Sequence, residues 1–399
     1  MGTSFDFDPF DPRFYDDPYP WYAEMRRSVP VYRRELPEGR LVDHYWMFAR
    51  ADDISAASAD SKTFSSALGP IIDTDASLLP PNLFNMDPPR HDELRSILSR
   101  AMTPRRIAGL EPHVEAFTRE LIDGWRGRGT VDLVSEFAHL IPTITMCALL
   151  GLPTEDRGKF LQWNLDSHGD DFTSDAALRA YQEMEDYWVQ LVEERRTTPT
   201  DDLVSQILHA EVGGAALSNE EISGFCSTLH HAAQNTTMMM LVSSALALAR
   251  HPDQRRALAE DPGRWDTAVD ELFRYESPVQ GLARVTTREV QVAGTTIPAG
   301  DQVLLLYGSA NRDETKFERP DELDIERDVR FHYAFGHGIH YCLGNAVARL
   351  EVRVALRQLL AAIPEFEADE HAVERYQLIP TRSVSRAPIT FEADALSNA

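Results

Sequence analysis

One cysteine in this chain stands where its thiolate could bind a metal ion. Cys342 follows the loop FGHGIHY at 335–341 and directly precedes a predicted helix over about 343–363. In that loop Gly336 and Gly338 permit tight turns and a close approach of the backbone. Free N–H groups at a helix N-terminus, together with the helix dipole, lower the pKa of a thiol and donate hydrogen bonds to its thiolate. The pattern therefore predicts a sulfur that is prepared to ligate iron.

Zinc is the competing metal, but the spacing of the ligands is poor for it. A zinc site built from His337, His340 and Cys342 would lack a fourth ligand at the spacing of structural zinc sites. Cys147 and Cys226 lie in apolar stretches with helical periodicity, where a cysteine fills the core. Cys342 is therefore the predicted metal ligand.

The cysteine loop resembles the haem-binding loop of the cytochrome P450 family. That family's pattern is F-x-x-G-x-[HR]-x-C-x-G, and residues 335–344 carry it in the local form F-G-x-G-x-H-x-C-x-G. The resemblance implies haem b as the cofactor and Cys342 as its axial thiolate ligand. It also implies that Phe335, Gly336, His340 and Gly344 contact the haem.

A second match lies in a long predicted helix over about 218–250. The run AAQNTT at 232–237 resembles the family's oxygen-binding motif A-G-x-[DE]-T-[TS]. The hydroxyl of Thr236 can donate back to the carbonyl of Ala232, which bends a helix and opens a groove. By resemblance, this groove holds dioxygen and a proton-delivering water, and Thr236 stabilises the activated oxygen.

Two residues of this run depart from the family's motif. Ala233 replaces the usual glycine, which makes the bend less easy, and Asn235 replaces the usual acid. An asparagine orients water but cannot titrate, so it cannot shuttle protons as a carboxylate does. Gln234 and His231 are the neighbours that could compensate, since histidine titrates near neutral pH. The predicted catalytic residues are Ala232, Ala233, Asn235 and Thr236.

Several charged residues resemble positions that hold the haem propionates in this family. His91 and Arg95 stand one helical turn apart in the run DPPRHDELR. Arg284 and His340 fill the two remaining positions. A guanidinium suits a carboxylate because it can bind both oxygens at once.

The pair Glu271-x-x-Arg274 resembles the family's E-x-x-R motif and precedes Cys342 by about 70 residues. By resemblance, this pair locks the irregular stretch that shapes the cysteine loop. Arg319 or a nearby residue of the FERPDELD segment is expected to complete it. Its role is then structural rather than catalytic, and its loss should prevent haem retention.

The elements that must position these residues are mostly helices, because apolar residues recur at helical spacing over most of the chain. Asp87 is expected to cap the first of the central helices, with Pro88 in its first turn. The predicted helices are 87–102, 107–125, 131–151, 174–196, 201–211, 218–250, 264–276 and 343–363. The predicted strands are a hairpin of 29–34 and 41–50 around the turn Pro37–Gly39, followed by 283–292, 295–297 and 302–307.

These elements predict a fold class that is mainly α with a minor β-sheet. The resemblance implies the cytochrome P450 fold, a triangular helical prism around a buried haem. Since no linker, repeat or composition break is present, a single domain over 1–399 is expected. Its parts would be a β-richer region at about 28–65, a helical body at about 87–276, and a haem-loop and C-terminal region at about 277–399.

Composition and charge limit the partners and the compartment. The net charge of −25 disfavours nucleic acid and anionic membrane surfaces. Three cysteines make no disulfide framework, which indicates a reducing compartment. The N-terminus lacks a signal-peptide pattern, and the apolar stretch 237–249 is shorter than the roughly 20 residues of a bilayer span. We therefore expect a cytoplasmic protein with no membrane anchor.

The resemblance implies a monooxygenase that inserts one atom of dioxygen into a small or medium hydrophobic substrate. Electrons would come from NAD(P)H through a ferredoxin reductase and a ferredoxin, and the chain is expected to be a monomer. Because Asn235 replaces the usual acid, one alternative is a peroxide-driven or non-oxygenating haem-thiolate enzyme. A second alternative is a non-catalytic haem protein that binds a ligand.

Two regions are expected to bind these partners. By resemblance, the substrate pocket draws on the mainly apolar runs 66–84, 279–283 and 383–385 in addition to Ala232 and Ala233. A basic cluster in this acidic chain is expected to steer an acidic ferredoxin. It consists of Arg90, Arg95, Arg100, Arg105 and Arg106.

Overall fold

The chain divides into two compact units, each built from segments that are far apart in the sequence. The computed structural model describes residues 5–9, 11–14, 17–74, 82–167, 174–212, 215–378, 381–393 and 396. Unit 1 consists of Met1–Pro88, Asp270–Cys342 and Arg375–Ser383. Unit 2 consists of Pro89–Val269, Leu343–Glu374 and Val384–Ala399. The expectation of a single domain over 1–399 stays a prediction. Within the described ranges, no helix is both long enough and apolar enough to cross a bilayer.

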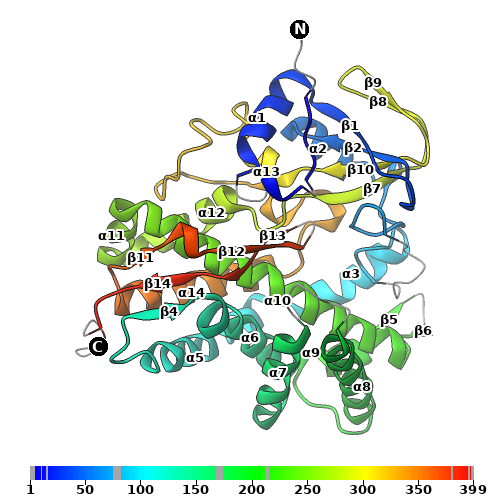
Figure 1. Ribbon diagram of the computed structural model, residues 1–399. Coiled ribbons are helices and arrows are strands. Elements are labelled where there is room, and N and C mark those ends of the chain that lie inside the picture. Colours follow the sequence, from blue (N-terminus) through cyan, green and yellow to red (C-terminus); the bar gives the residue numbers. More distant parts are fainter. Residues whose placement is uncertain are drawn as a thin grey trace. The chain divides into compact units, whose positions relative to one another are not determined.

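Unit 1 is organised around a five-stranded sheet with the strand order β1-β2-β10-β7-β3 (Figure 1). Strands β1 (Val31–Glu35) and β2 (His44–Phe48) form the predicted antiparallel hairpin. Strand β10 (Gln302–Leu305) runs parallel to β2 and antiparallel to β7 (Leu282–Thr286). The sheet therefore joins the beginning of the chain to the region just before the cysteine loop. Strand β3 (Phe64–Ser65) pairs with β7.

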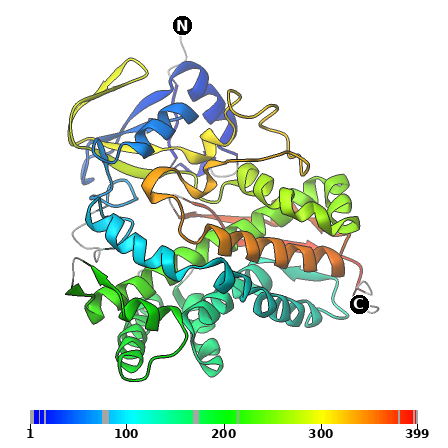
Figure 2. The same cartoon turned by 180° about the vertical axis from the view of Figure 1, so that it is seen from behind.

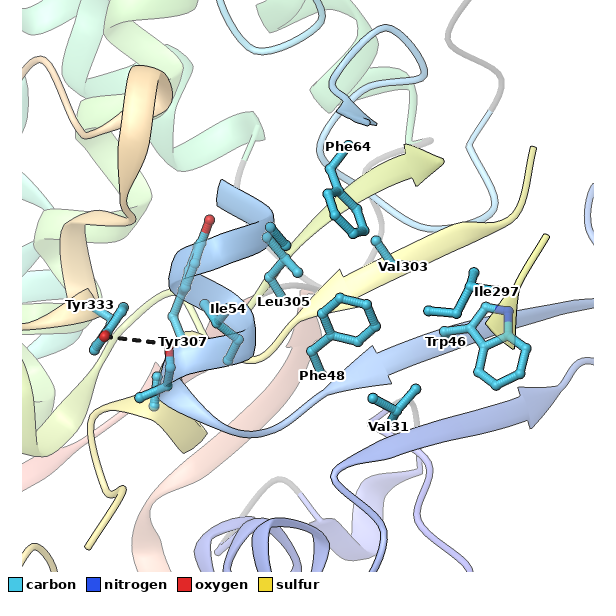
Figure 3. Packing of buried hydrophobic residues seen from close by; sticks show 13 residues of the cluster. Val31, Trp46, Phe48, Ile54, Phe64, Ile297, Val303, Leu305, Tyr307 and Tyr333 are labelled. Carbon is cyan, nitrogen blue, oxygen red and sulfur yellow. Dashed lines mark hydrogen bonds between the residues drawn. The ribbon is translucent and has the colours of Figure 1, made fainter. Parts of the chain in front are cut away.

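Alternate residues of the central strands point to one face of this sheet and form a buried cluster (Figure 3). Phe48 of β2 and Leu305 of β10 lie in this cluster, and Ile54 of helix α2 (Ala51–Ala59) packs with them. The cluster also includes Tyr307 and Tyr333. Since Tyr333 is two residues before Phe335, the core of the sheet continues into the start of the cysteine loop.

The remaining elements of unit 1 are short. The strand predicted at 283–292 divides into β7 and β8, and β8 forms its own hairpin with β9. The irregular stretch expected at 311–335 contains short turns and, at its end, the single 3-10 turn η6. The bounds are η1 (Pro12–Phe14), α1 (Tyr19–Ser28), β8 (Val290–Val292), β9 (Thr295–Ile297), α13 (Tyr307–Ala310), η6 (Tyr333–Phe335) and η7 (Gly338–His340).

Unit 2 is helical, and its longest element is α10 (Asn219–Arg250). This helix opens with the predicted capping box, in which the N–H of Glu221 donates to Ser218 Oγ and the Glu221 carboxylate accepts from the Ser218 N–H. Helix α10 packs against α6 (Leu140–Leu150). Helix α14 (Asn345–Ala362) is orange in Figure 2 and packs against both α10 and α5 (Glu111–Asp123).

Three predictions in unit 2 and at its border need correction. The helix expected at 107–125 is two helices, α4 (Pro104–Ala108) and α5. The helix expected at 131–151 begins instead with strand β4 (Thr130–Asp132), which pairs with β14 (Pro388–Thr390), and a π-helical turn before α6. Asp87 does not cap α3 (Arg90–Ala101), because its carboxylate accepts from the Ser66 N–H at 2.9 Å and from the Ser65 hydroxyl.

The other elements of unit 2 complete a mainly α chain with minor sheets, as the sequence predicts. Helix α12 (Trp265–Glu276) begins in unit 2 and ends in unit 1. Strands β12 (Glu374–Leu378) and β13 (Thr381–Arg386) also span the division. The remaining bounds are η3 (Val134–Ala138), η4 (Thr154–Asp156), α7 (Arg157–Ser167), α8 (Asp175–Thr197), α9 (Leu203–Leu208), β5 (Glu211–Val212), β6 (Ala215–Ala216), α11 (Pro252–Glu260), η5 (Pro262–Arg264), β11 (Glu367–Ala368) and η8 (Glu370–Ala372).

Candidate functional site

The cysteine loop of unit 1 is held by its own backbone and by two glycines. The N–H of Cys342 donates to the carbonyl of Phe335 at 2.8 Å, which closes the loop. Gly336 and Gly338 have φ angles of +73° and +72°, in the left-handed region that favours glycine. A Cβ at position 338 would lie 2.1 Å from the carbonyl oxygen of Ser58, so only glycine lets the loop approach α2.

The three cysteines have different surroundings, and the role of Cys342 as metal ligand stays a prediction. Burial raises the pKa of Cys147 and of Cys226 to about 12, so both remain thiols at neutral pH. Cys342 is partly exposed. The zinc alternative finds no support, because the described part of the chain contains no group of three or more His, Cys, Asp or Glu residues placed to hold a metal ion.

A buried ion pair on α12 holds the stretch before the loop, as the E-x-x-R resemblance implies. Glu271 and Arg274 are fully buried, and their carboxylate and guanidinium form two hydrogen bonds of 2.7 and 2.8 Å. Arg274 also donates to the carbonyls of Pro320 at 2.7 Å and Glu322 at 3.1 Å. The pair therefore ties α12 to the irregular stretch that leads to the cysteine loop.

The expected third member is Arg319 or a nearby residue of the FERPDELD segment. Arg319 is wrong, whereas Asp324 of that segment does contact Glu271. Arg319 is an exposed residue that pairs with Glu322 and Asp324. Arg327 takes the place instead, because its Nε donates to Glu271 Oε1 at 3.2 Å. The N–H of Asp324 donates to the same oxygen at 2.9 Å, so the FERPDELD segment contributes backbone rather than a charged side chain.

Asn311 carries the constraint from α12 to the start of the loop. Its carbonyl accepts from Arg274 Nη1 at 2.9 Å, and its side-chain oxygen accepts from the N–H of Tyr333 at 2.6 Å. Phe273 adds apolar contact, with its ring stacked on His332 and 4.5 Å from the Phe335 ring centroid. Helix α12 therefore contacts Phe335 directly and Tyr333 through Asn311.

Two of the predicted propionate residues lie in unit 1. His340 Nε2 lies 3.0 Å from Ser66 Oγ, and the Ser66 N–H is fixed by Asp87. Arg284 is only 4% exposed, and its Nη1 donates to the carbonyl of Ala283 at 2.6 Å. Within the described residues no carboxylate pairs with Arg284. A buried guanidinium without an anion is costly, so these residues fit a haem that brings its own carboxylates.

The other two predicted propionate residues lie on α3 of unit 2. His91 is fully buried, with Nδ1 2.9 Å from Asp92 Oδ1. Arg95 lies one turn later and is half-buried. The structure therefore brings His91 and Arg95 together on one helix, as their spacing predicts.

The predicted oxygen-binding run lies on α10, where the expected back-bond is present. Thr236 Oγ1 donates to the carbonyl of Ala232 at 2.8 Å. Ala232, Ala233 and Thr236 are half-buried and share one face of the helix, whereas Asn235 is buried at 8% exposure. Two small side chains and one hydroxyl therefore lie on a single half-buried face of α10.

Gln234 and His231 are the neighbours expected to compensate for Asn235. Both side chains form hydrogen bonds with other groups. Gln234 Nε2 donates to the carbonyl of His139 at 2.7 Å, and its oxygen accepts from Thr143 at 3.0 Å. His231 Nδ1 donates to the carbonyl of Ser227 at 2.8 Å, and burial lowers its pKa. Neither side chain is therefore placed to give protons to Thr236.

Sequence reasoning missed several residues that organise the site. Asn311, Arg327 and Ser66 act through contacts with residues far away in the sequence, and no local pattern indicates them. Glu351 of α14 is a buried acid outside every motif named above. It stands at helical spacing among the buried residues Val347, Val354 and Ala355, where an acid is unusual. Of the predicted pocket run 66–84, residues 75–81 lie outside the described residues.

Comparison with known proteins places this arrangement in a family. The family model described as Cytochrome P450 matches residues 265–379. Cytochrome P450 130 of Mycobacterium tuberculosis is 40% identical over 371 residues, which cover 90% of this chain and 91% of that protein. Vitamin D(3) 25-hydroxylase of Pseudonocardia autotrophica is 39% identical over 393 residues, which cover 96% of each.

A solved structure agrees with these relatives. The structure of cytochrome P450 CYP109Q5 from Chondromyces apiculatus matches with a TM-score of 0.87 and 36% identity, and the match covers 97% of this chain and 98% of that chain. Identity of this level over nearly the whole length, on the same fold, is shared only by members of one family. This chain therefore belongs to the cytochrome P450 family, whose members bind haem through a cysteine thiolate and act as monooxygenases.

Proposed function

We propose that this cytochrome P450 oxygenates a small or medium hydrophobic molecule, with Thr236 at the oxygen site. The observation that carries the proposal is the 2.8 Å hydrogen bond from Thr236 Oγ1 to the Ala232 carbonyl. This bond fixes the hydroxyl of Thr236 at a half-buried face of α10, which stays α-helical from Asn219 to Arg250. Thr236 then serves as the hydrogen-bonding group for oxygen, and Ala232 and Ala233 leave space beside it.

The same proposal assigns the residues that hold the haem. Cys342 is the thiolate ligand, and Phe335, Gly336 and Gly344 shape the loop around it. His91, Arg95, Arg284 and His340 bind the propionates. Haem, when bound, supplies the iron at which dioxygen is activated. The protein's own groups bind and orient the substrate, exclude water and control the delivery of protons.

The substrate class rests on the apolar character of the expected pocket and on one relative. The name vitamin D(3) 25-hydroxylase denotes an enzyme that hydroxylates a hydrophobic molecule. Vitamin D(3) is therefore the first probe to test. We also propose that the chain works as a monomer in the cytoplasm.

Isotope incorporation tests this proposal. The enzyme would be supplied with NAD(P)H, a ferredoxin reductase, a ferredoxin, a panel of hydrophobic probes that includes vitamin D(3), and labelled dioxygen. We expect one labelled oxygen atom in the product and a thiolate-type carbon monoxide difference spectrum of the reduced enzyme. A product whose oxygen comes from water, or a spectrum without the red-shifted band, would contradict the proposal.

The proposed electron donor is an acidic ferredoxin that docks on part of the basic cluster. Arg90 pairs with Glu221, and Arg106 pairs with Asp201, so these two charges are balanced. Arg100 and Arg105 are exposed and have no carboxylate partner among the described residues. The attraction for a negative partner therefore rests mainly on Arg100 and Arg105.

Reversing the charge of Arg100 or Arg105 to glutamate is expected to slow reduction by ferredoxin about tenfold at low ionic strength, since such surface charges mainly change the rate of association. The effect should shrink as salt is added, because salt screens the attraction. Stopped-flow kinetics measure both the rate of reduction and its dependence on salt. Arg179→Glu is the matched control, since Arg179 is an exposed arginine of α8. Equal rates for all four proteins would remove the docking proposal.

A peroxide-driven enzyme is the second candidate, and Asn235 is the observation that favours it. The family's motif has an acid at this place, and neither Gln234 nor His231 is free to replace it. An enzyme that takes its oxygen from peroxide has less need of a proton supply at this helix.

Substitutions at Asn235 and Thr236 separate the two candidates. Asn235→Asp restores a carboxylate of nearly the same volume, so we expect haem binding to be retained and more product to form per peroxide released. Thr236→Ala is expected to lower the ratio of product to peroxide by about tenfold, the scale of one lost hydrogen bond of about 1.4 kcal/mol. Product, peroxide and NAD(P)H consumption would be measured together. If both variants match the wild type and peroxide alone supports full turnover, the peroxide-driven candidate is correct.

A further inference from the structure

The face of α10 that lies opposite Thr236 carries a row of buried contacts. His230, Gln234 and Met238 follow one another at intervals of four residues, so their side chains lie on one face of the helix. All three residues are buried, with exposed fractions of 0 to 2%. Thr236 stands two residues after Gln234, which places it about 200° around the helix, since successive residues are turned by about 100°. The back row of His230, Gln234 and Met238 is therefore opposite the proposed oxygen face.

A chain of four hydrogen bonds joins the back row to α7 and to the start of α6. His230 Nε2 donates to Asn164 Oδ1 at 3.0 Å, and Asn164 Nδ2 donates to Thr143 Oγ1 at 2.9 Å. Thr143 Oγ1 donates to Gln234 Oε1 at 3.0 Å, and Gln234 Nε2 donates to the carbonyl of His139 at 2.7 Å. Each side chain donates to the next, so one direction of donation satisfies all four contacts at once.

His139 extends these contacts by one more turn of α10. Its Nδ1 lies 3.3 Å from Met238 Sδ, while its carbonyl accepts from Gln234. The back row thus meets α7 or the start of α6 before, within and after the run 232–237, and all of these segments belong to unit 2. Three successive turns of α10 are held from the side opposite Thr236.

Polar contacts fix a helix in a way that apolar contacts do not. The hydrophobic effect is non-directional, so an apolar face lets a buried helix turn or slide by a small amount. A buried amide must instead keep its partners, because an unpaired one costs its desolvation, and a single buried amide can set the register of packed helices. From Met238 to Ala249, α10 offers only apolar side chains and two serines. The directional contacts beside the run 232–237 therefore centre on Gln234.

We propose that Gln234 fixes the rotation of α10 and thereby holds Thr236 at the oxygen site. The proposal rests on the proposed role of Thr236. The end of a side chain about 5 Å from the helix axis moves by about 1 Å when the helix turns by about 12°. A displacement of about 1 Å can lower a reaction rate about 100-fold. Because Gln234 acts through the helix that carries Thr236, it is a positioning residue rather than a catalytic residue.

Gln234→Met tests the proposal, because methionine has nearly the length and volume of glutamine but no amide. Folding and haem binding should be retained. With NAD(P)H, ferredoxin reductase and ferredoxin, and no added substrate, the ratio of water to hydrogen peroxide formed from dioxygen should fall about tenfold, the scale of one lost hydrogen bond. Consumption of NAD(P)H and dioxygen and release of peroxide would be measured together.

Hydrogen exchange gives a readout that does not depend on turnover. In the haem-loaded enzyme, the amides of residues 232–237 should exchange about tenfold faster in Gln234→Met than in the wild type, because the contacts that oppose local opening are lost. The amides of residues 244–249 lie beyond the back row and should exchange at the wild-type rate. Mass spectrometry of the peptides from α10 measures both segments in one experiment.

Gln234→Glu adds a pH profile that a purely steric role would not produce. A protonated glutamate can donate to the His139 carbonyl and accept from Thr143, as glutamine does, whereas the ionised form has no hydrogen to donate. A buried glutamate can titrate as high as about pH 8 to 9. Gln234→Glu should therefore resemble the wild type at about pH 6 and Gln234→Met at about pH 9. It also supplies the folded comparison if Gln234→Met does not fold.

The ionisable groups around Gln234 are the same in all of these proteins. They are His139 at the start of α6, His230 and His231 of α10, Glu185 of α8, which accepts from Ser227 of α10, and the buried Glu351 of α14. Helix α7 faces the back row with the neutral Asn164. The titration of these groups therefore appears equally in the wild type and in Gln234→Met, and only Gln234→Glu gains a further dependence on pH.

Ser244→Ala is the matched control. Ser244 is a fully buried polar residue of α10, and its Oγ has no hydrogen-bond partner among the described residues. Its removal should leave both the ratio of water to peroxide and the exchange of residues 232–237 as in the wild type.

Three results would overturn the proposal. The first is a wild-type ratio of water to peroxide in Gln234→Met while Thr236→Ala lowers it, which would make the back row a packing feature only. The second is wild-type exchange of residues 232–237 in Gln234→Met, and the third is a Gln234→Glu enzyme without additional pH dependence. If Thr236→Ala is silent, the proposed oxygen site fails instead, and the exchange rates alone then decide whether Gln234 holds α10.

Discussion

Replacing Cys342 with alanine is expected to abolish both the thiolate-type carbon monoxide spectrum and all oxygenation that depends on reductant. Alanine has no atom that can ligate iron, so the loss should be complete rather than partial. Helix content should stay close to that of the wild type, because Cys342 is partly exposed and its N–H bond to Phe335 is made by the backbone. Difference spectroscopy and circular dichroism measure the two properties on one sample.

Cys147→Ala and Cys226→Ala are the controls for this experiment. Both thiols are buried, and each substitution removes only a small part of the core, so stability should fall while the spectrum is retained. A red-shifted carbon monoxide band in Cys342→Ala would show that another residue is the ligand.

Arg274→Ala is expected to destabilise the protein by about 3 to 5 kcal/mol, because it leaves the fully buried carboxylate of Glu271 without its partner. This is a large share of the roughly 5 to 15 kcal/mol that holds a typical domain. The contacts of Arg274 with Asn311, Pro320 and Glu322 are lost as well, so the cysteine loop should loosen and haem should be released. Denaturant unfolding and the haem content of the purified protein provide the measurements.

Arg319→Ala is the matched control for Arg274→Ala. Its ion pairs with Glu322 and Asp324 are exposed, and such pairs contribute about 0 to 1 kcal/mol. The loss of stability in Arg327→Ala should lie between those of Arg319→Ala and Arg274→Ala, since Arg327 adds one 3.2 Å contact to Glu271. If Arg319→Ala costs as much as Arg274→Ala, the assignment of the third position to Arg327 is wrong.

The elements that could be predicted from the sequence are those encoded locally. The start of α10 follows from Ser218 and Glu221, whose side chains satisfy the first backbone groups of the helix. The elements that were predicted wrongly depend on partners that are distant in the sequence. Val131 and Asp132 fall in the helix predicted at 131–151 but belong to β4, because Pro388–Thr390 offers them a strand partner. Distant strand pairing of this kind overrides local propensity.

In the candidate site, too, the features encoded locally could be predicted and those that depend on distant residues could not. The cysteine loop could be recognised because all its signals lie within ten residues, 335–344. Asp87 has the residue type and position of a helix cap, but Ser65 and Ser66 compete for its carboxylate from another part of unit 1. Arg319 and Arg327 have the same chemistry, and only the folded path of the chain decides which one reaches Glu271.

The parallel pairing of β2 with β10 has a consequence for the time course of synthesis. The β1–β2 hairpin is complete by Phe48, but its neighbour begins only at Gln302. At about 5 to 20 residues per second, the ribosome needs roughly 10 to 50 s to produce the chain between them. During this interval one edge of β2 and the apolar side chains of Trp46 and Phe48 have no partner strand. Until Gln302–Leu305 has been made, the nascent N-terminal region is therefore expected to need chaperones that protect it against aggregation.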